Sequence, residues 1–140
     1  RAYMKSHFAA ELPDAAIATL LEHDGARPNP LSLIAIRTLG GAVARADASA
    51  YAHRAATFNV SIDAFWDDPD LDEQAIGWAR SAWDAFEPFG TGGVYGNFSG
   101  LNDEADRLRA SIQGASAGRL DRIRVAFDPD GIFAAAAAAP

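Results

Sequence analysis

The sequence predicts one α+β domain, in which a mostly antiparallel sheet carries helices on one of its faces. Residues 31–39 are aliphatic and β-branched but too short for a typical helix, and residues 57–66 alternate apolar and polar side chains as a strand does. Other segments repeat apolar residues at helical spacing. Strands joined by both short and helical connections are typical of the α+β class, and 140 residues are enough for one core.

Four segments have the character of strands. The alternation in residues 57–66 places five apolar side chains on one face, namely Phe58, Val60, Ile62, Ala64 and Trp66. The opposite face carries Asn59, Ser61, Asp63 and Phe65. Residues 31–39, the glycine-rich residues 92–100 and an edge strand at residues 2–8 complete the expected sheet.

Four segments show helical spacing. Residues 13–24 begin at a proline suited to a first turn and end before Gly25. A second helix is expected from Asp70, as its N-cap, to about Phe86, with Trp78 and Trp83 packed in the core. Two further helical stripes follow, formed by Leu101, Ala105, Leu108 and Ile112 and then by Leu120, Ile123 and Phe127.

The polar strand face is the most informative feature of the predicted fold. If the helices cover the apolar face of residues 57–66, then Asn59, Ser61 and Asp63 lie on a face without helices. Such a face either meets solvent, lines a substrate cleft or receives a partner. The sequence alone leaves these three alternatives open.

Composition excludes several classes of function. A net charge of −7 with dispersed basic residues argues against nucleic-acid binding. The chain has no cysteine and its three histidines lack ligand spacing, so no disulfide and no metal site are expected. No apolar run approaches the length of a membrane span and no signal peptide is evident, so no membrane partner and a cytoplasmic location are expected.

Several motifs occur in order along the chain: RAYMKSHFAAELPDAAIATLLE, LGGAVARADASAYAHRAATFNVSIDAFW, IGWAR, GVYGNFSG and RLDRIRVAFDPDGIF. Together they resemble the C-terminal half of FAD-linked oxidases related to berberine bridge enzyme, within the vanillyl-alcohol oxidase superfamily. The most specific part is the Tyr-x-Asn-Phe segment paired with the later Asp-Pro-Asp ending. The resemblance covers nearly the whole chain.

The resemblance implies that residues 1–140 are a single substrate-domain fragment, with residues 92–133 as the berberine-bridge-like C-terminal segment. In that family an N-terminal domain holds the flavin, and this domain would precede Arg1 and is absent here. FAD is therefore expected in the full-length parent but not on this chain alone, which is expected to be inactive by itself. The expected reaction is flavin-mediated oxidation of a hydroxyl- or amine-bearing small molecule. The uncovered sheet face would be open to the flavin domain or, in the isolated chain, to the partner in a homodimer.

The resemblance also implies roles for individual residues. Tyr95 is the expected catalytic base, Asn97 the expected cofactor contact, and the substrate-facing residues are Asn59, Ser61 and Asp63. Oxidation of an alcohol by hydride transfer leaves a proton to remove, which requires a base within hydrogen-bonding reach. A phenol serves as that base only beside a positive charge or hydrogen-bond donors, and Arg37 or Lys5 is the candidate neighbour.

Another class of function fits the same residues. The chain can be a stand-alone dimeric α+β module that binds a small ligand without flavin. In that case Tyr95 is an ordinary strand tyrosine, Asn97 satisfies a turn, and the pair His53–Arg54 lies in a surface or subunit-facing loop.

Overall fold

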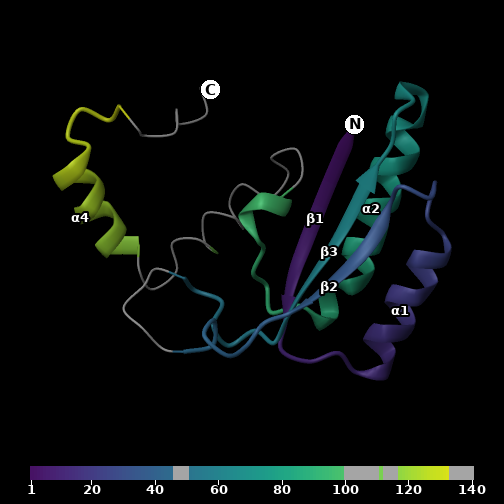
Figure 1. The fold of residues 1–140 in the computed structure, drawn as a ribbon, viewed down its shortest axis with the longest axis horizontal. Helices are drawn as coiled ribbons and strands as arrows, with labels where there is room; N and C mark the ends of the chain where they lie inside the picture. Colours follow the sequence, from purple (N-terminus) through teal and green to yellow (C-terminus); the bar gives the residue numbers. More distant parts are fainter. Residues whose placement is uncertain (46–50, 100–110, 112–116, 133–140) are drawn as a thin grey trace.

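The computed structural model describes residues 1–45, 51–99, 111 and 117–132. In these residues three strands form one antiparallel sheet with the order β1-β3-β2 (Figure 1). The strands are β1 (Ala2–Ala9), β2 (Leu33–Thr38) and β3 (Phe58–Phe65). The expected α+β class is confirmed, and so is the expected edge strand near the N-terminus.

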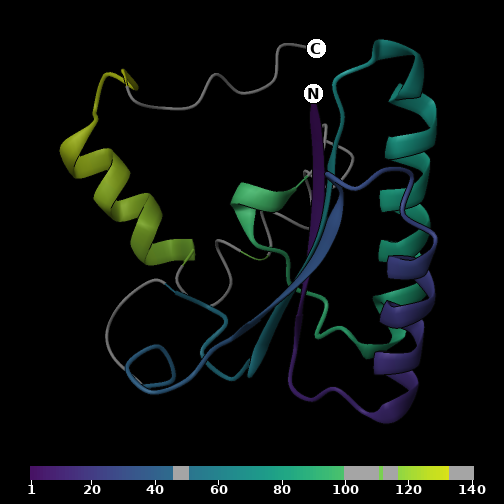
Figure 2. The ribbon, with the colours of Figure 1, turned by 45° about the vertical axis from the view of Figure 1, so that its right-hand side comes forward.

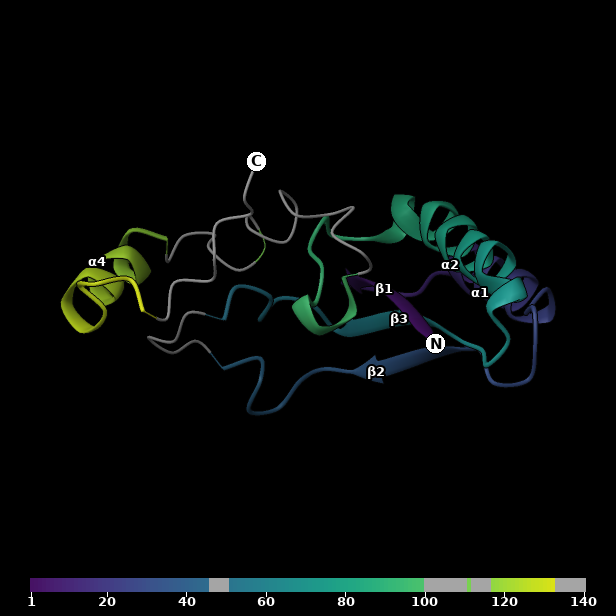
Figure 3. The same ribbon diagram turned by 90° about the horizontal axis from the view of Figure 1, so that it is seen from above.

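Two helices cover one face of the sheet. They are α1 (Asp14–Gly25) and α2 (Asp72–Phe86), and Figure 3 shows both on the same side of the three strands. The helix α4 (Ala117–Phe127) lies well apart from α1 and α2 (Figure 2). Three short 3₁₀ turns are also present, η1 (Pro69–Leu71), η2 (Glu87–Phe89) and η3 (Gly96–Phe98).

The core lies between α1, α2 and the apolar face of the sheet. Val60, Ile62 and Ala64 are fully buried there, as the alternation of the sequence predicts. The helix α2 packs Ala79, Trp83 and Phe86 against them, and Trp78 is buried as well. The indole of Trp83 donates a hydrogen bond to the carbonyl of Ser6 over 3.1 Å, so even its polar atom has a partner inside the core.

The opposite face of the sheet has no helix among the described residues, and we call it the open face. It carries the second set of alternating side chains. The strand register pairs Phe8 with Asn59, Ser6 with Ser61, and Arg37 with Asn59. Directly paired residues in an antiparallel sheet project to the same side. Side chains from all three strands therefore meet on the open face.

The prediction of a strand at residues 92–100 is wrong. Residues 92–99 form no strand. Gly96–Phe98 is the 3₁₀ turn η3, and the one β-bridge from these residues to the sheet is the isolated bridge between Lys5 and Ser99. Gly92 has a φ of 83°, a left-handed conformation that interrupts an extended strand. The segment instead leaves the edge of β1 and crosses the open face. We call residues 91–99 the crossing segment.

The expected N-cap of the second helix is also wrong. Asp68, and not Asp70, accepts a hydrogen bond from a backbone N–H, and it caps the short turn η1. The helix α2 then begins at Asp72 behind Leu71. Proline at residue 69 favours this extra turn because its fixed φ suits the first position of a helical turn.

Some predictions fall on residues outside those described. The helical stripe formed by Leu101, Ala105, Leu108 and Ile112 belongs to this group. In the described part of the chain, no helix combines the length and the apolar character needed to cross a membrane.

Candidate functional site

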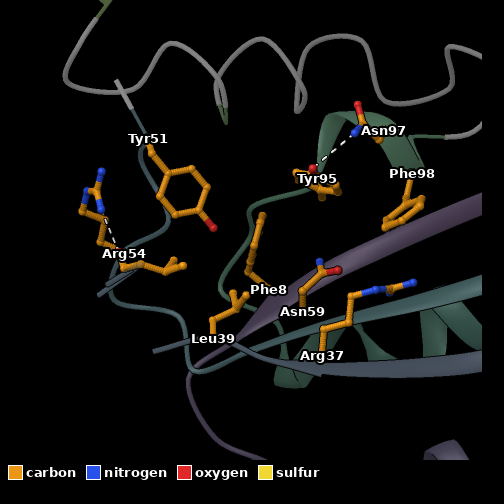
Figure 4. A pocket seen from close by; sticks show the side chains of 10 residues that line it. Phe8, Arg37, Leu39, Tyr51, Arg54, Asn59, Tyr95, Asn97 and Phe98 are labelled. Carbon is orange, nitrogen blue, oxygen red and sulfur yellow. Dashed lines mark hydrogen bonds between the residues drawn. The ribbon is translucent and has the colours of Figure 1, made fainter. Parts of the chain in front are cut away.

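A cavity of about 630 Å³ lies on the open face. It is lined by Phe8, Arg37, Leu39, Val43, Tyr51, Arg54, Asn59, Tyr95, Asn97 and Phe98, which come from strands, loops and the crossing segment (Figure 4). Small-molecule sites have this order of size and this combination of aromatic walls with few polar groups. Both residues expected from the family motif, Tyr95 and Asn97, line it.

The floor of the cavity comes from the sheet. Phe8 of β1, Asn59 of β3 and Arg37 of β2 stand side by side across the three strands because of the register. Phe8 is almost fully buried, and the side-chain amide of Asn59 donates to the carbonyl of His7 over 3.2 Å. The floor is therefore held by regular strand pairing.

The crossing segment forms the opposite wall. The hydroxyl of Ser6, on the open face, accepts a hydrogen bond from the backbone N–H of Tyr95 over 3.0 Å. Closer to the sheet edge, the N–H of Thr91 donates to the carbonyl of Phe8 over 2.7 Å. These contacts anchor the segment on β1 and bring Tyr95 over the sheet, on the side away from α1 and α2.

Tyr95 and Asn97 interact directly. The side-chain amide of Asn97 donates to the hydroxyl of Tyr95 over 3.2 Å (Figure 4). The Tyr95 ring meets Phe8 and Phe98 edge to face, with centroids 6.4 Å and 5.3 Å away. Tyr95 is 39% exposed, so its hydroxyl is reachable while its ring is held by two neighbours.

A second phenol faces the same cavity. Figure 4 shows the hydroxyl of Tyr51 pointing into the space below Tyr95. Burial and the nearby Tyr95 raise the pKa of the Tyr51 phenol above 10.0, and the positive charge of Arg54 opposes this rise. Tyr51 therefore stays protonated at neutral pH and presents a hydroxyl that donates and accepts.

The three polar residues of β3 separate into two groups. Asn59 lines the cavity, whereas Ser61 and Asp63 lie further along the strand, buried and outside the cavity lining. Arg37 donates to the Ser61 hydroxyl over 2.7 Å, and that hydroxyl donates to a carboxylate oxygen of Asp63 over 3.0 Å. Ser61 and Asp63 thus fix the position of the Arg37 guanidinium without lining the cavity themselves.

Asp63 is an acid in a poorly solvated position. Its side chain is 7% exposed, and the Arg37 Nη2 lies 3.9 Å from its Oδ2. Burial raises the pKa of Asp63 above 3.8, although the Ser61 hydrogen bond and the Arg37 charge act in the opposite direction. The second carboxylate oxygen, Oδ1, is buried without a hydrogen-bond partner.

His53 supports the crossing segment, a role that the sequence did not reveal. Its ring stacks on Phe8 with a centroid distance of 4.1 Å, and its Nε2 hydrogen-bonds to the hydroxyl of Ser111. That hydroxyl accepts from the N–H of Val94 and donates to the carbonyl of Val94 over 3.1 Å and 2.9 Å. Since Ser111 gives its single proton to Val94, His53 is the donor in their contact.

Gly93 makes room for this arrangement. A Cβ atom on residue 93 would lie 2.3 Å from the Cε1 of His53. Burial lowers the pKa of His53 below 6.5, and the hydrogen bond with Ser111 offsets part of this effect. His53 lies in a loop, and its side chain is half-buried because its ring packs beneath the segment that carries Tyr95.

The two expected cationic neighbours of Tyr95 lie on different faces. Arg37 is on the open face, with its Cζ 4.8 Å from the centre of the Phe98 ring. Lys5 projects to the helix side, where its Nζ lies 3.9 Å from the Trp83 ring centre. The suggestion that Lys5 assists Tyr95 is therefore wrong, because Lys5 pairs with Ile62, whose side chain faces the helices. Among the described residues, no group of three or more potential metal ligands occurs.

The fold is similar to part of several solved oxidoreductases. The structure of wild-type Physcomitrella patens BBE-like 1 gives a TM-score of 0.76 at 19% identity and covers 91% of this chain. The structure of GilR with pregilvocarcin, described as an oxidoreductase of the terminal step of gilvocarcin biosynthesis, gives 0.75 at 24% identity over 94% of this chain. Aclacinomycin oxidoreductase gives 0.75 at 21% identity over 95% of this chain.

This chain corresponds to a minor part of each of those proteins, namely 28% of the first and 31% of the other two. No protein-family model and no curated protein sequence matches it. The expected likeness to the berberine-bridge-like oxidoreductases is confirmed at the level of the fold.

Proposed function

We propose that this chain is the substrate-binding part of an FAD-dependent oxidoreductase. The observation that carries the proposal is the position of Tyr95 over the open face, with its hydroxyl hydrogen-bonded by Asn97 at the wall of a 630 Å³ cavity. The fold shared with part of known oxidoreductases supports it. The substrate would enter the cavity between the sheet floor and the crossing segment.

The described residues suit a substrate and a flat ring better than a whole dinucleotide. Pyrophosphate groups in dinucleotide-binding folds sit on a glycine-rich turn at a helix N-terminus. The strand-to-helix connections here, residues 10–13 and 66–71, contain no glycine, and residues 66–71 carry three aspartates. We therefore propose that another part of the full-length protein holds the pyrophosphate, and that Asn97 approaches the flavin ring.

The chain's own residues handle the proton of the substrate. Bound FAD would supply the hydride acceptor for the substrate carbon. The Tyr95 oxygen would accept the hydroxyl proton of the substrate as the C–O bond becomes a carbonyl. Asn97 orients the Tyr95 oxygen and donates to its anionic form, as a base in this position requires.

Exposed apolar side chains on and just beyond α4 fit the expectation of a further domain. Val125 is 74% exposed, Phe127 is 83% exposed, and Ile132 just beyond the helix is 75% exposed. Large apolar side chains at this level of exposure cost free energy in water and are typical of an interaction surface. We propose that they pack against the flavin-holding part of the protein.

Flavin retention tests the proposal. The full-length protein and the 140-residue chain are each incubated with FAD, desalted and examined by visible absorption. We expect the full-length protein to stay yellow and the chain to lose its flavin. Tight stoichiometric FAD on the chain would contradict the proposed division, and a colourless full-length protein would contradict the flavoprotein proposal itself.

One observation favours the second candidate, a dimeric ligand-binding module without flavin. Within the described residues, the outer edge of β2 pairs with no strand, and Leu33 and Ile36 on β2 are 38% and 48% exposed. Open edges of this kind pair readily with a second chain. Light scattering of the isolated chain measures this association, and a dimer that binds ligand with no flavin anywhere in the full-length protein would favour the module.

A further inference from the structure

The cavity on the open face has the opposite charge to the protein as a whole. The chain carries 19 acidic and 12 basic residues, a net charge of −7. Yet the described residues that line the cavity include Arg37 and Arg54 and not one aspartate or glutamate. A ligand in the cavity therefore meets positive charge against a negative surrounding surface.

Arg37 is held so that part of its guanidinium remains available. A guanidinium has five N–H donors, and the Ser61 hydroxyl accepts from Nη1. The nearest Asp63 oxygen lies 3.9 Å from Nη2, beyond a normal hydrogen bond. The Arg37 side chain is 44% exposed, whereas the Asp63 side chain is 7% exposed and lies behind it. An incoming ligand meets the cation and not the acid.

The second arginine stands at the other end of the cavity. Arg54 donates from Nη1 to the carbonyl of Val43 over 2.7 Å, which fixes its position. Its Cζ lies 5.5 Å from the centre of the Tyr51 ring, one of the cavity walls. Apart from the amides of Asn59 and Asn97, the other lining residues are aromatic or aliphatic, so the space between the two arginines suits a flat and largely apolar body.

We propose that the cavity selects a flat aromatic hydroxyl compound that carries an anionic substituent, with Arg37 as the residue that recognises the anion. Amine substrates, which are cationic at neutral pH, are disfavoured because no lining carboxylate among the described residues can pair with them. This inference rests on the proposed function only where it calls the ligand a substrate. The preference for an anionic ligand concerns binding alone.

A set of three matched probes tests the preference. They are 4-(hydroxymethyl)benzoate, 4-methylbenzyl alcohol and 4-(hydroxymethyl)benzylamine, which share a benzyl alcohol and differ in charge. Their dissociation constants for the full-length protein are measured by calorimetry. We expect the benzoate to bind at least about tenfold more tightly than the amine, with the neutral alcohol between them, and the gap to narrow at high salt.

Variants assign the preference to Arg37. Arg37→Gln should reduce the ratio between benzoate and amine affinity by about tenfold and leave the neutral alcohol nearly unchanged. Arg124→Gln makes the same charge change on the exposed surface of α4 and should leave the ratio as in the wild type. Arg37→Lys, which keeps the charge, should retain much of the preference.

The outcomes separate this inference from the proposed function. Equal or tighter binding of the amine, or an unchanged ratio in Arg37→Gln, would overturn the inference even if the protein retains FAD. If Arg37→Gln does not fold because Asp63 loses its neighbouring cation, the double variant Arg37→Gln/Asp63→Asn removes both charges and gives the same readout. Binding of the benzoate to a protein without flavin would support the inference and contradict only the oxidoreductase proposal.

Discussion

Asn97 donates a hydrogen bond from its side-chain amide to the hydroxyl of Tyr95 over 3.2 Å. The two residues are separated by one glycine. Tyr95 directly precedes the turn η3, and Asn97 lies within it. The turn brings the two side chains together. In an extended strand, residues i and i+2 project to the same face but are held further apart by the rise of the strand. The pair is the centre of the proposed substrate site.

Replacement of Tyr95 by phenylalanine tests the proposed base. We expect Tyr95→Phe in the full-length protein to lower kcat by about 10²-fold or more, the usual loss when a general base is removed. The thermal midpoint should change little, because Tyr95 is 39% exposed. Steady-state kinetics and thermal unfolding measure the two quantities.

Tyr3→Phe is the matched control for this change. Tyr3 is buried on the helix side of the sheet and its hydroxyl accepts from Arg80 over 3.1 Å. We expect this control to lower the thermal midpoint and to leave kcat unchanged. If the two variants were equally active, Tyr95 would not be the base.

Asn97→Leu tests the hydrogen bond to the phenol while keeping a side chain of similar size. A hydrogen bond to a charged group contributes about 1.5–3 kcal/mol, so loss of the donor should lower kcat by about tenfold or more. The effect should appear in kcat and less in KM, since the donor serves the ionised oxygen during proton transfer. An effect confined to KM would indicate that Asn97 contacts the substrate instead.

Gly93→Ala tests the support that His53 gives to the crossing segment. The added Cβ would lie 2.3 Å from His53 Cε1, so we expect a loss of about 1–3 kcal/mol in the free energy of unfolding, as for an overpacked site. The double variant Gly93→Ala/His53→Ala should recover part of that loss. Chemical denaturation measures each value.

Gly77→Ala provides the control for a glycine replacement. Residue 77 lies within α2, where an added Cβ meets nothing within 4 Å. Alanine should therefore stabilise the helix by about 0.5–1 kcal/mol. Equal changes in the free energy of unfolding for Gly77→Ala and Gly93→Ala would mean that the contact with His53 does not destabilise Gly93→Ala.

Asp63→Asn should show a stability difference that depends on pH. Burial raises the pKa of Asp63 in the folded state above 3.8, so its favourable contribution is present below that pH and is lost as the pH rises through the folded-state pKa. The amide does not titrate, and it can still accept from Ser61. We expect the free energy of unfolding of the variant to rise relative to that of the wild type as the pH increases from 4 to neutral.

Thermal unfolding at several pH values measures this gain. Asp67→Asn, at an exposed position near the start of η1, is the matched control and should show no such trend. If Asp63→Asn instead became less stable relative to the wild type as the pH rose, the charge pair between Asp63 and Arg37 would outweigh the cost of burying the carboxylate.

Phe127→Ser tests the proposed contact of α4 with the rest of the protein. Phe127 is 83% exposed, so the free energy of unfolding of the isolated chain should change by less than about 0.5 kcal/mol. In the full-length protein the same change should lower flavin content or thermal stability. Arg122→Ser, on the same helix, is the control, and an identical response of both variants would argue against an apolar contact at Phe127.

The local pattern of the sequence predicted most of the regular elements. The alternation from Phe58 to Trp66 identified β3 and both of its faces, and the helical spacing identified α1 and α2. These predictions succeeded because the periodic burial of side chains in a helix or strand appears as a pattern of apolar residues within a short stretch of sequence. The choice of Tyr95 and Asn97 came from a family resemblance and not from periodicity, and their catalytic and cofactor roles stay predictions.

The contacts that shape the cavity depend on residues far apart in the sequence. The glycine-rich residues 92–99 have little local conformational preference, and their path follows hydrogen bonds to the hydroxyls of Ser6 and Ser111. In the same way, antiparallel pairing of β2 with β3 placed Arg37 against Ser61 and separated it from Lys5. Composition and periodicity by themselves determined a helix-covered sheet with one polar face. Only the tertiary structure decided what lies on that face, because hydrogen bonds and packing between distant segments leave no repeating signal in the chain.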